Sequence, residues 1–162
     1  MDWILAILLF LHVAGAIIAF GPTFAFPFIG AMGGKEPMHV NFALRLQHRI
    51  TSRIVFPLAL VQGITGLLLV WRIGFEILSH GWLLLAIVLY LAALANAYFV
   101  LTPTAEKLIE ATSTPPPPPP AGTAPSGPPP HLVALITRAR TFGMVNGLLI
   151  LVIVFLMVTK PF

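Results

Sequence analysis

Four long apolar stretches constrain this chain more than any other feature of its sequence. They cover residues 3–32, 54–71, 82–101 and 142–158, and none of them contains Lys, Arg, Asp or Glu. An α-helix needs about 20 apolar residues to cross the hydrocarbon core of a bilayer. We therefore predict an all-α fold, an integral membrane up-and-down bundle of four transmembrane helices. Residues 1–162 are expected to form a single domain, and the lipid bilayer is its first partner.

Composition excludes several classes of protein. Only 9% of the residues are charged and 58% are hydrophobic, whereas a soluble domain has about 25% charged residues. The chain has no cysteine, which excludes disulfides, thiolate metal sites and covalently attached haem. The apolar stretches contain no carboxylate, which disfavours a carboxylate-driven ion pump. Cations in the loops are the only feature that would favour nucleic-acid binding, so we expect no nucleic-acid partner.

The distribution of cations predicts the orientation in the membrane. Seven cations flank one side of the predicted spans: Lys35, Arg45, Arg49, Arg53, Lys107, Arg138 and Arg140. The opposite side has Arg72 and Lys160. Because cytoplasmic loops carry an excess of Lys and Arg, we expect the seven-cation side to be cytoplasmic. In a cell (inner) membrane, both termini would then be extracytoplasmic.

Prolines indicate where the helices are interrupted. Gly21-Pro22 predicts a kink or break in the first stretch. Thr102-Pro103 is typical of a helix N-cap, which predicts a short surface helix over residues 104–110. Residues 114–130 are proline-rich and of low complexity, and they predict a cytoplasmic polyproline II spacer or a disordered insert.

His12 is the residue most suggestive of chemistry. It lies about 13 Å into the first span, near the middle of the membrane, where an ionisable side chain is a functional hypothesis by default. Three readings stay open: a hydrogen bond that locks helix packing, an iron ligand for haem b, or a proton relay. Depth matching in an antiparallel bundle places Gln62, Thr65 and Tyr90 at the same level. No second histidine lies there, so a haem would be five-coordinate or would borrow another ligand.

Two further patterns carry alternatives. Asn41, Arg45, Arg49 and Arg53 are spaced by four and form one helical stripe, either a headgroup anchor or a rim for haem propionates. Small residues spaced by four, such as Gly143 and Gly147, indicate close helix packing within the bundle or a homodimer face. Asn96 and Asn146 are expected to form an interhelical hydrogen bond.

Three short motifs support a resemblance to a family. They are Leu11-His12-Val13-Ala14-Gly15, Thr65-Gly66-Leu67-Leu68-Leu69 and Met157-Val158-Thr159-Lys160-Pro161. With four spans in this length, the chain resembles the predicted integral membrane proteins of domain-of-unknown-function family 2269. More remotely it is similar to the membrane superfamily of haem-containing protoporphyrinogen oxidases and copper-resistance D domains. This resemblance implies haem binding at the first-span histidine, here His12. The oxidases carry a lysine in the third span and residues 81–101 contain none, which favours a non-enzymatic role.

These observations lead to three hypotheses of function. The first is an inner-membrane protein that binds haem b through His12, with Gln62, Thr65, Arg49 and Arg53 as further cofactor-binding residues. The second is a non-catalytic accessory subunit that packs against a larger membrane complex. The third is a small-solute transporter.

Overall fold

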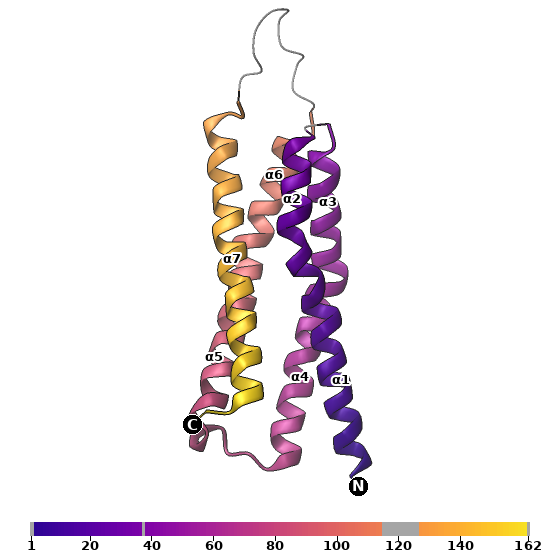
Figure 1. The fold of residues 1–162 in the computed structure, drawn as a ribbon, viewed down its shortest axis with the longest axis vertical. Coiled ribbons are helices and arrows are strands. Elements are labelled where there is room, and N and C mark those ends of the chain that lie inside the picture. Colours follow the sequence, from indigo (N-terminus) through magenta and orange to yellow (C-terminus); the bar gives the residue numbers. More distant parts are fainter. Residues whose placement is uncertain (1, 37, 115–126, 162) are drawn as a thin grey trace, which may run out of the picture.

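The computed structural model describes residues 2–36, 38–114 and 127–161. Within these residues it contains four helical segments that are long and apolar enough to cross a membrane: Trp3–Lys35, Val40–Ile73, Gly81–Ala111 and Pro130–Thr159. They run alternately up and down and form one elongated bundle (Figure 1). The predicted all-α, four-helix membrane fold is confirmed. The central part of the predicted proline-rich loop, residues 115–126, lies outside the described residues.

The first segment bends without breaking. Helix α1 (Trp3–Phe20) leads into a 3₁₀ turn (Gly21–Ala25) and then into α2 (Phe26–Lys35). Pro22 lies in this turn. Its backbone nitrogen carries no hydrogen, so it cannot donate the bond that a regular α-helix makes to its preceding turn. The Thr23 hydroxyl donates to the Phe20 carbonyl at 2.6 Å, a contact that bridges α1 and the turn. The predicted kink near Pro22 is therefore a tightened turn.

The second and third segments each contain a π turn just before a proline. Helix α3 (Val40–Ile50) passes through the π turn Thr51–Val55 into α4 (Phe56–Ile73). Helix α5 (Gly81–Asn96) passes through the π turn Ala97–Leu101 into α6 (Thr102–Ala111). A π turn uses i→i+5 bonds, and it accommodates the ring of a following proline without ending the helix.

The second π turn overturns one prediction. Thr102 is helical and is no N-cap; its hydroxyl donates to the Ala97 carbonyl at 2.9 Å. Helix α6 continues the third segment, and its Thr104 and Leu108 side chains are buried. The prediction of a separate surface helix over residues 104–110 was wrong because the chain bridges Pro103 with a wide turn that keeps backbone groups paired, as a membrane environment requires.

The fourth segment is the single helix α7 (Pro130–Thr159), which ends where Lys160 adopts a left-handed conformation with φ 45°. The Lys160 ammonium then lies 5.8 Å from the ring centroids of both Phe75 and Trp82. The Lys160-Pro161 motif therefore ends the helix and stabilises this end of the bundle through cation–π contacts. We call this the terminal end, since α1 begins there and α7 ends there (Figure 1).

The helices pack mainly in two antiparallel pairs, α1 with α4 and α5 with α7. Trp82, Leu83, Ala86 and Leu156 form a buried cluster between α5 and α7 at the terminal end. The Asn96 amide donates to the Phe142 carbonyl at 3.0 Å and to Asn146 Oδ1 at 3.1 Å, which confirms the predicted interhelical bond. Most other large apolar side chains are exposed, as expected of a bundle surrounded by lipid.

The small residues spaced by four on α1 pack against a neighbouring helix, whereas those on α7 do not. Gly15 and Ala19 are small residues spaced by four on α1. Ala19 is fully buried, and a Cβ at Gly15 would lie 2.9 Å from Gln62 Oε1 of α4, so this pair packs within the bundle. A Cβ at Gly143 or Gly147 would meet nothing within 4 Å. Packing inside the bundle is therefore the wrong interpretation for the pair on α7, and the homodimer face stays a prediction.

The helical segments are longer than a membrane is thick. They have 30–34 residues each, or about 45–51 Å at 1.5 Å per residue, against a hydrocarbon core of about 30 Å. Helices α2, α3, α6 and the start of α7 therefore form a helical extension at the opposite end, which we call the loop end (Figure 1). Asn41 of α3 holds this extension together because its amide donates to the Ile109 carbonyl at 2.8 Å and to the Thr112 hydroxyl at 3.0 Å.

Candidate intramembrane ligand site

His12 lies on the side of α1 that faces α4. Its Nδ1 is 2.9 Å from the Thr65 hydroxyl oxygen, and the imidazole is half-buried. The depth argument therefore identified Thr65 correctly. The hydrogen bond also shows that His12 ties the two helices together, whatever else it does.

The hydrogen bonds of Thr65 assign the proton on the imidazole. The Thr65 hydroxyl also lies 3.0 Å from the Val61 carbonyl and 3.1 Å from the Gln62 carbonyl of its own helix. Carbonyls only accept, so the single hydroxyl proton is directed to the backbone and the oxygen accepts from His12 Nδ1–H. In the neutral imidazole Nε2 then keeps its lone pair, which makes Nε2 the atom that can bind a metal or accept a proton.

Glycines allow the two helices to approach at this level. A Cβ at Gly66 would lie 3.2 Å from His12 Cε1, so the imidazole rests directly on the backbone of α4. A Cβ at Gly15 would lie 2.9 Å from Gln62 Oε1, so the amide of α4 rests on the backbone of α1. At both positions an added Cβ would force the neighbouring polar side chain to shift, so the two glycines allow the close approach of α1 and α4.

Gln62 has an unsatisfied atom in this interface. The residue is 8% exposed, and its Oε1 is buried without a hydrogen-bond partner in the part of the chain that the structure describes. An unpaired buried amide oxygen costs free energy in an apolar environment. His12, Thr65 and Gln62 together thus provide a lone-pair nitrogen, its orienting hydroxyl and an unpaired acceptor within one interface.

Tyr90 does not join this cluster. Its hydroxyl donates to the Ala59 carbonyl at 2.8 Å and so links α5 to α4. The phenol ring lies against Gly63, where a Cβ would be 2.5 Å from the hydroxyl oxygen and 3.0 Å from Cζ. Tyr90 is therefore a brace between the two helix pairs.

Arg49 and Arg53 lie apart from His12. Arg53 and Thr65, the partner of His12, lie on the same helical segment and are about 18 Å apart along it, at 1.5 Å per residue. Both arginines line a groove of about 470 Å³ between α3 and α6 at the loop end, together with Arg45, His48, Ser52, Glu106, Ile109 and Glu110. The two glutamates were not predicted as part of this site, because residues 104–110 were expected to form a short surface helix.

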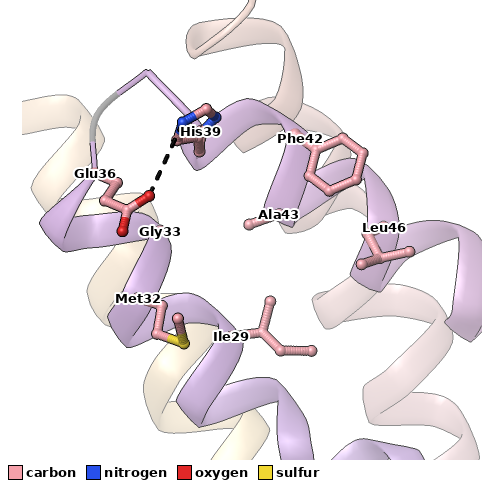
Figure 2. A pocket seen from close by; sticks show the side chains of 8 residues that line it. All are labelled: Ile29, Met32, Gly33, Glu36, His39, Phe42, Ala43 and Leu46. Atoms are coloured by element: carbon pink, nitrogen blue, oxygen red, sulfur yellow. Dashed lines mark ion pairs between the residues drawn. The ribbon is translucent and has the colours of Figure 1, made fainter.

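A second hollow of about 200 Å³ lies between α2 and α3 at the same end of the bundle. Figure 2 shows its apolar side chains, with Ile29 and Met32 on one helix and Phe42 and Leu46 on the other. Glu36 and His39, 3.9 Å apart, form an exposed ion pair at its rim. Neither hollow is lined by His12.

The sequence model of one protein family matches almost the whole chain. The family is described as "Predicted integral membrane protein (DUF2269)", and the match covers residues 6–161. It therefore includes His12, Gln62 and Thr65, the groove and both π turns. No curated protein and no solved structure matches the chain.

Proposed function

We propose that this chain, a member of the DUF2269 family of predicted integral membrane proteins, binds haem b and that His12 would hold the iron. The observation that carries the proposal is the hydrogen bond between His12 Nδ1 and Thr65. Histidines that bind metals donate their other ring N–H to an acceptor, which fixes the tautomer and the ring orientation. In this chain Thr65 is that acceptor, and it leaves Nε2 available.

The residues present fit haem iron better than a bare metal ion. A single imidazole is sufficient as a protein ligand of haem, since the porphyrin supplies the other nitrogens, whereas a structural metal ion such as zinc needs about four protein ligands. Bound haem would supply one-electron redox chemistry in the membrane. His12 would hold the iron, Thr65 would orient His12, and Gln62 Oε1 would be free to accept a hydrogen bond. Arg49 and Arg53 are not part of this proposed site.

A visible absorption spectrum of the protein purified in mild detergent tests this proposal. We expect a Soret band that sharpens and shifts when dithionite reduces the protein. His12→Ala should lose the band while remaining inserted in the membrane. The matched control is His39→Ala, since this exposed histidine lies at the loop end. Full pigment in His12→Ala, or colourless wild-type protein produced with ample haem, would refute the proposal.

The hollow of Figure 2 favours a second candidate, a non-catalytic accessory subunit of a larger membrane complex. Its lining is almost entirely apolar, and the nearby Phe28 and Phe42 rings are 74% and 60% exposed. Exposed aromatic side chains beside an apolar hollow are typical of protein-binding surfaces. Reproducible co-purification with larger subunits, without pigment and abolished by Phe42→Ser, would support this candidate over the first.

We also propose that the loop end faces the cytoplasm and that both chain ends are extracytoplasmic in the inner membrane. The excess of cations at the loop end supports this orientation. Because the chain has no cysteine, single Ser79→Cys and Ser113→Cys variants report the two ends cleanly. In whole cells an impermeant thiol reagent should label the first variant and not the second. The reverse labelling pattern would refute the orientation.

A further inference from the structure

The groove between α3 and α6 has walls of opposite charge. Arg45, Arg49 and Arg53 line one side together with His48 and Ser52. Glu106 and Glu110 line the other side, on α6. The two helices are held in place above the groove by Asn41, whose amide binds Ile109 and Thr112 of α6. These bonds keep α3 beside α6, and the groove between the two helices has a volume of about 470 Å³.

The charged side chains on the two walls of the groove, all among the described residues, form no ion pair with one another. The ion pairs in the described part of the chain join His39 to Glu36 and Arg72 to Asp2, so the groove arginines and glutamates are more than 4.0 Å apart. Three cations and two carboxylates thus face a shared space without a direct contact. A ligand that carries both an anion and a cation would satisfy both walls.

The groove lies at the depth of lipid headgroups. Arg53 is about 27 Å along the helix from the exposed Trp71 at the terminal end, close to the thickness of the hydrocarbon core, about 30 Å. Arg49 and Arg45 lie about 6 Å and 12 Å further out. Phosphate groups of the bilayer occupy this zone, so the first molecules to reach the groove are phospholipids.

An apolar surface continues from the groove toward the membrane centre. Phe56 follows Arg53 on the same helical segment, and its ring lies 5.9 Å from that of Tyr98, on the segment that continues into α6. Tyr98 of this pair is exposed, and so are Ile54 and Phe99. A lipid with its headgroup in the groove could therefore lay an acyl chain along this surface.

We propose that the groove binds the headgroup of phosphatidylethanolamine. The arginines hold the phosphate, for which the guanidinium group has a matching bidentate geometry. Glu106 and Glu110 hold the primary ammonium. An anionic phosphatidylglycerol would leave the carboxylates without a partner, and the quaternary amine of phosphatidylcholine has no N–H to donate. The two charged walls therefore select a zwitterion with a primary amine.

Native mass spectrometry of delipidated protein in detergent, with each of the three lipids added in turn, tests the proposal. We expect wild-type protein to retain phosphatidylethanolamine at least about fivefold more tightly than phosphatidylglycerol, since one charge near the membrane surface changes affinity by about that factor. The double variant Glu106→Gln/Glu110→Gln should lose this preference and bind phosphatidylglycerol more tightly. The double variant Arg49→Gln/Arg53→Gln should weaken the binding of both lipids.

Glu76→Gln is the control for the same type of substitution, because this exposed carboxylate lies near the terminal end and its loss should leave the preference unchanged. Circular dichroism checks that every variant remains helical. A wild-type preference for phosphatidylglycerol would overturn the assignment, since the arginines would then act alone. Equal retention of the three lipids by wild-type protein, or an unchanged preference in the glutamate variants, would also overturn it.

Discussion

The contact between Gly63 and Tyr90 allows a quantitative test of the packing. Gly63→Ala places a Cβ 2.5 Å from the Tyr90 hydroxyl oxygen, 3.0 Å from Cζ and 3.2 Å from Cε1. Since carbon atoms of the ring are also too close, the phenol cannot escape by a small hydroxyl shift. The whole ring must move, and the 2.8 Å bond from Tyr90 to the Ala59 carbonyl is lost.

The expected change in stability follows from three contributions. Overpacking a filled site costs about 2 kcal/mol, within a range of 1–3. The lost interhelical hydrogen bond costs about 0.6 kcal/mol in a membrane protein. The higher helix propensity of alanine stabilises the helix by about 0.9 kcal/mol relative to glycine. Gly63→Ala should therefore lower the free energy of unfolding by about 1.7 kcal/mol.

Gly147→Ala is the matched control, since a Cβ there meets nothing within 4 Å. It retains only the helix-propensity gain and should raise the free energy of unfolding by up to about 0.9 kcal/mol. Equilibrium titration with sodium dodecyl sulfate from a mild detergent, followed by far-ultraviolet circular dichroism, measures both variants. Tyr90→Phe in the Gly63→Ala background removes the closest contact and should recover part of the loss. Equal stabilities of the two alanine variants would refute the packing argument.

Substitutions at three further positions test other contacts. Asn96→Ala removes two hydrogen bonds to α7 and should lower the free energy of unfolding by about 1.2 kcal/mol, at about 0.6 per bond, in the same titration; no change would show that the bonds contribute nothing. Thr65→Val removes the acceptor for His12 and should reduce haem occupancy, while Thr65→Ser should retain it; equal Soret absorbance in the two variants would contradict the orienting role. Lys160→Gln removes the cation above the Trp82 ring and should lower the free energy of unfolding by about 0.5–1 kcal/mol in the same titration; no change would speak against this contact.

The sequence predicted the depth of residues better than the direction in which they point. Counting residues along antiparallel spans placed His12, Thr65 and Tyr90 at one level, and His12 does bind Thr65. The same count does not specify the side of the helix that a residue occupies. Tyr90 comes from α5, and its long side chain reaches the Ala59 carbonyl instead of His12.

The groove shows a similar limit. Spacing by four correctly indicated that Arg45, Arg49 and Arg53 share one side of a helix. It did not indicate which element faces them, because α6 was expected to leave the bundle at Pro103. The penalty for unpaired backbone groups keeps the chain helical there, so Glu106 is carried opposite the arginines.

The two π turns affect how this chain is compared with its relatives. A π turn holds about one residue more than an α turn, and one residue rotates a helix by about 100°. The extra residue in Thr51–Val55 therefore sets the angle between the arginines and the His12-binding face of α4. A relative that has a regular helix there should be one residue shorter at that point. Placing its alignment gap at any other position would match the arginines to residues on a different side of the helix.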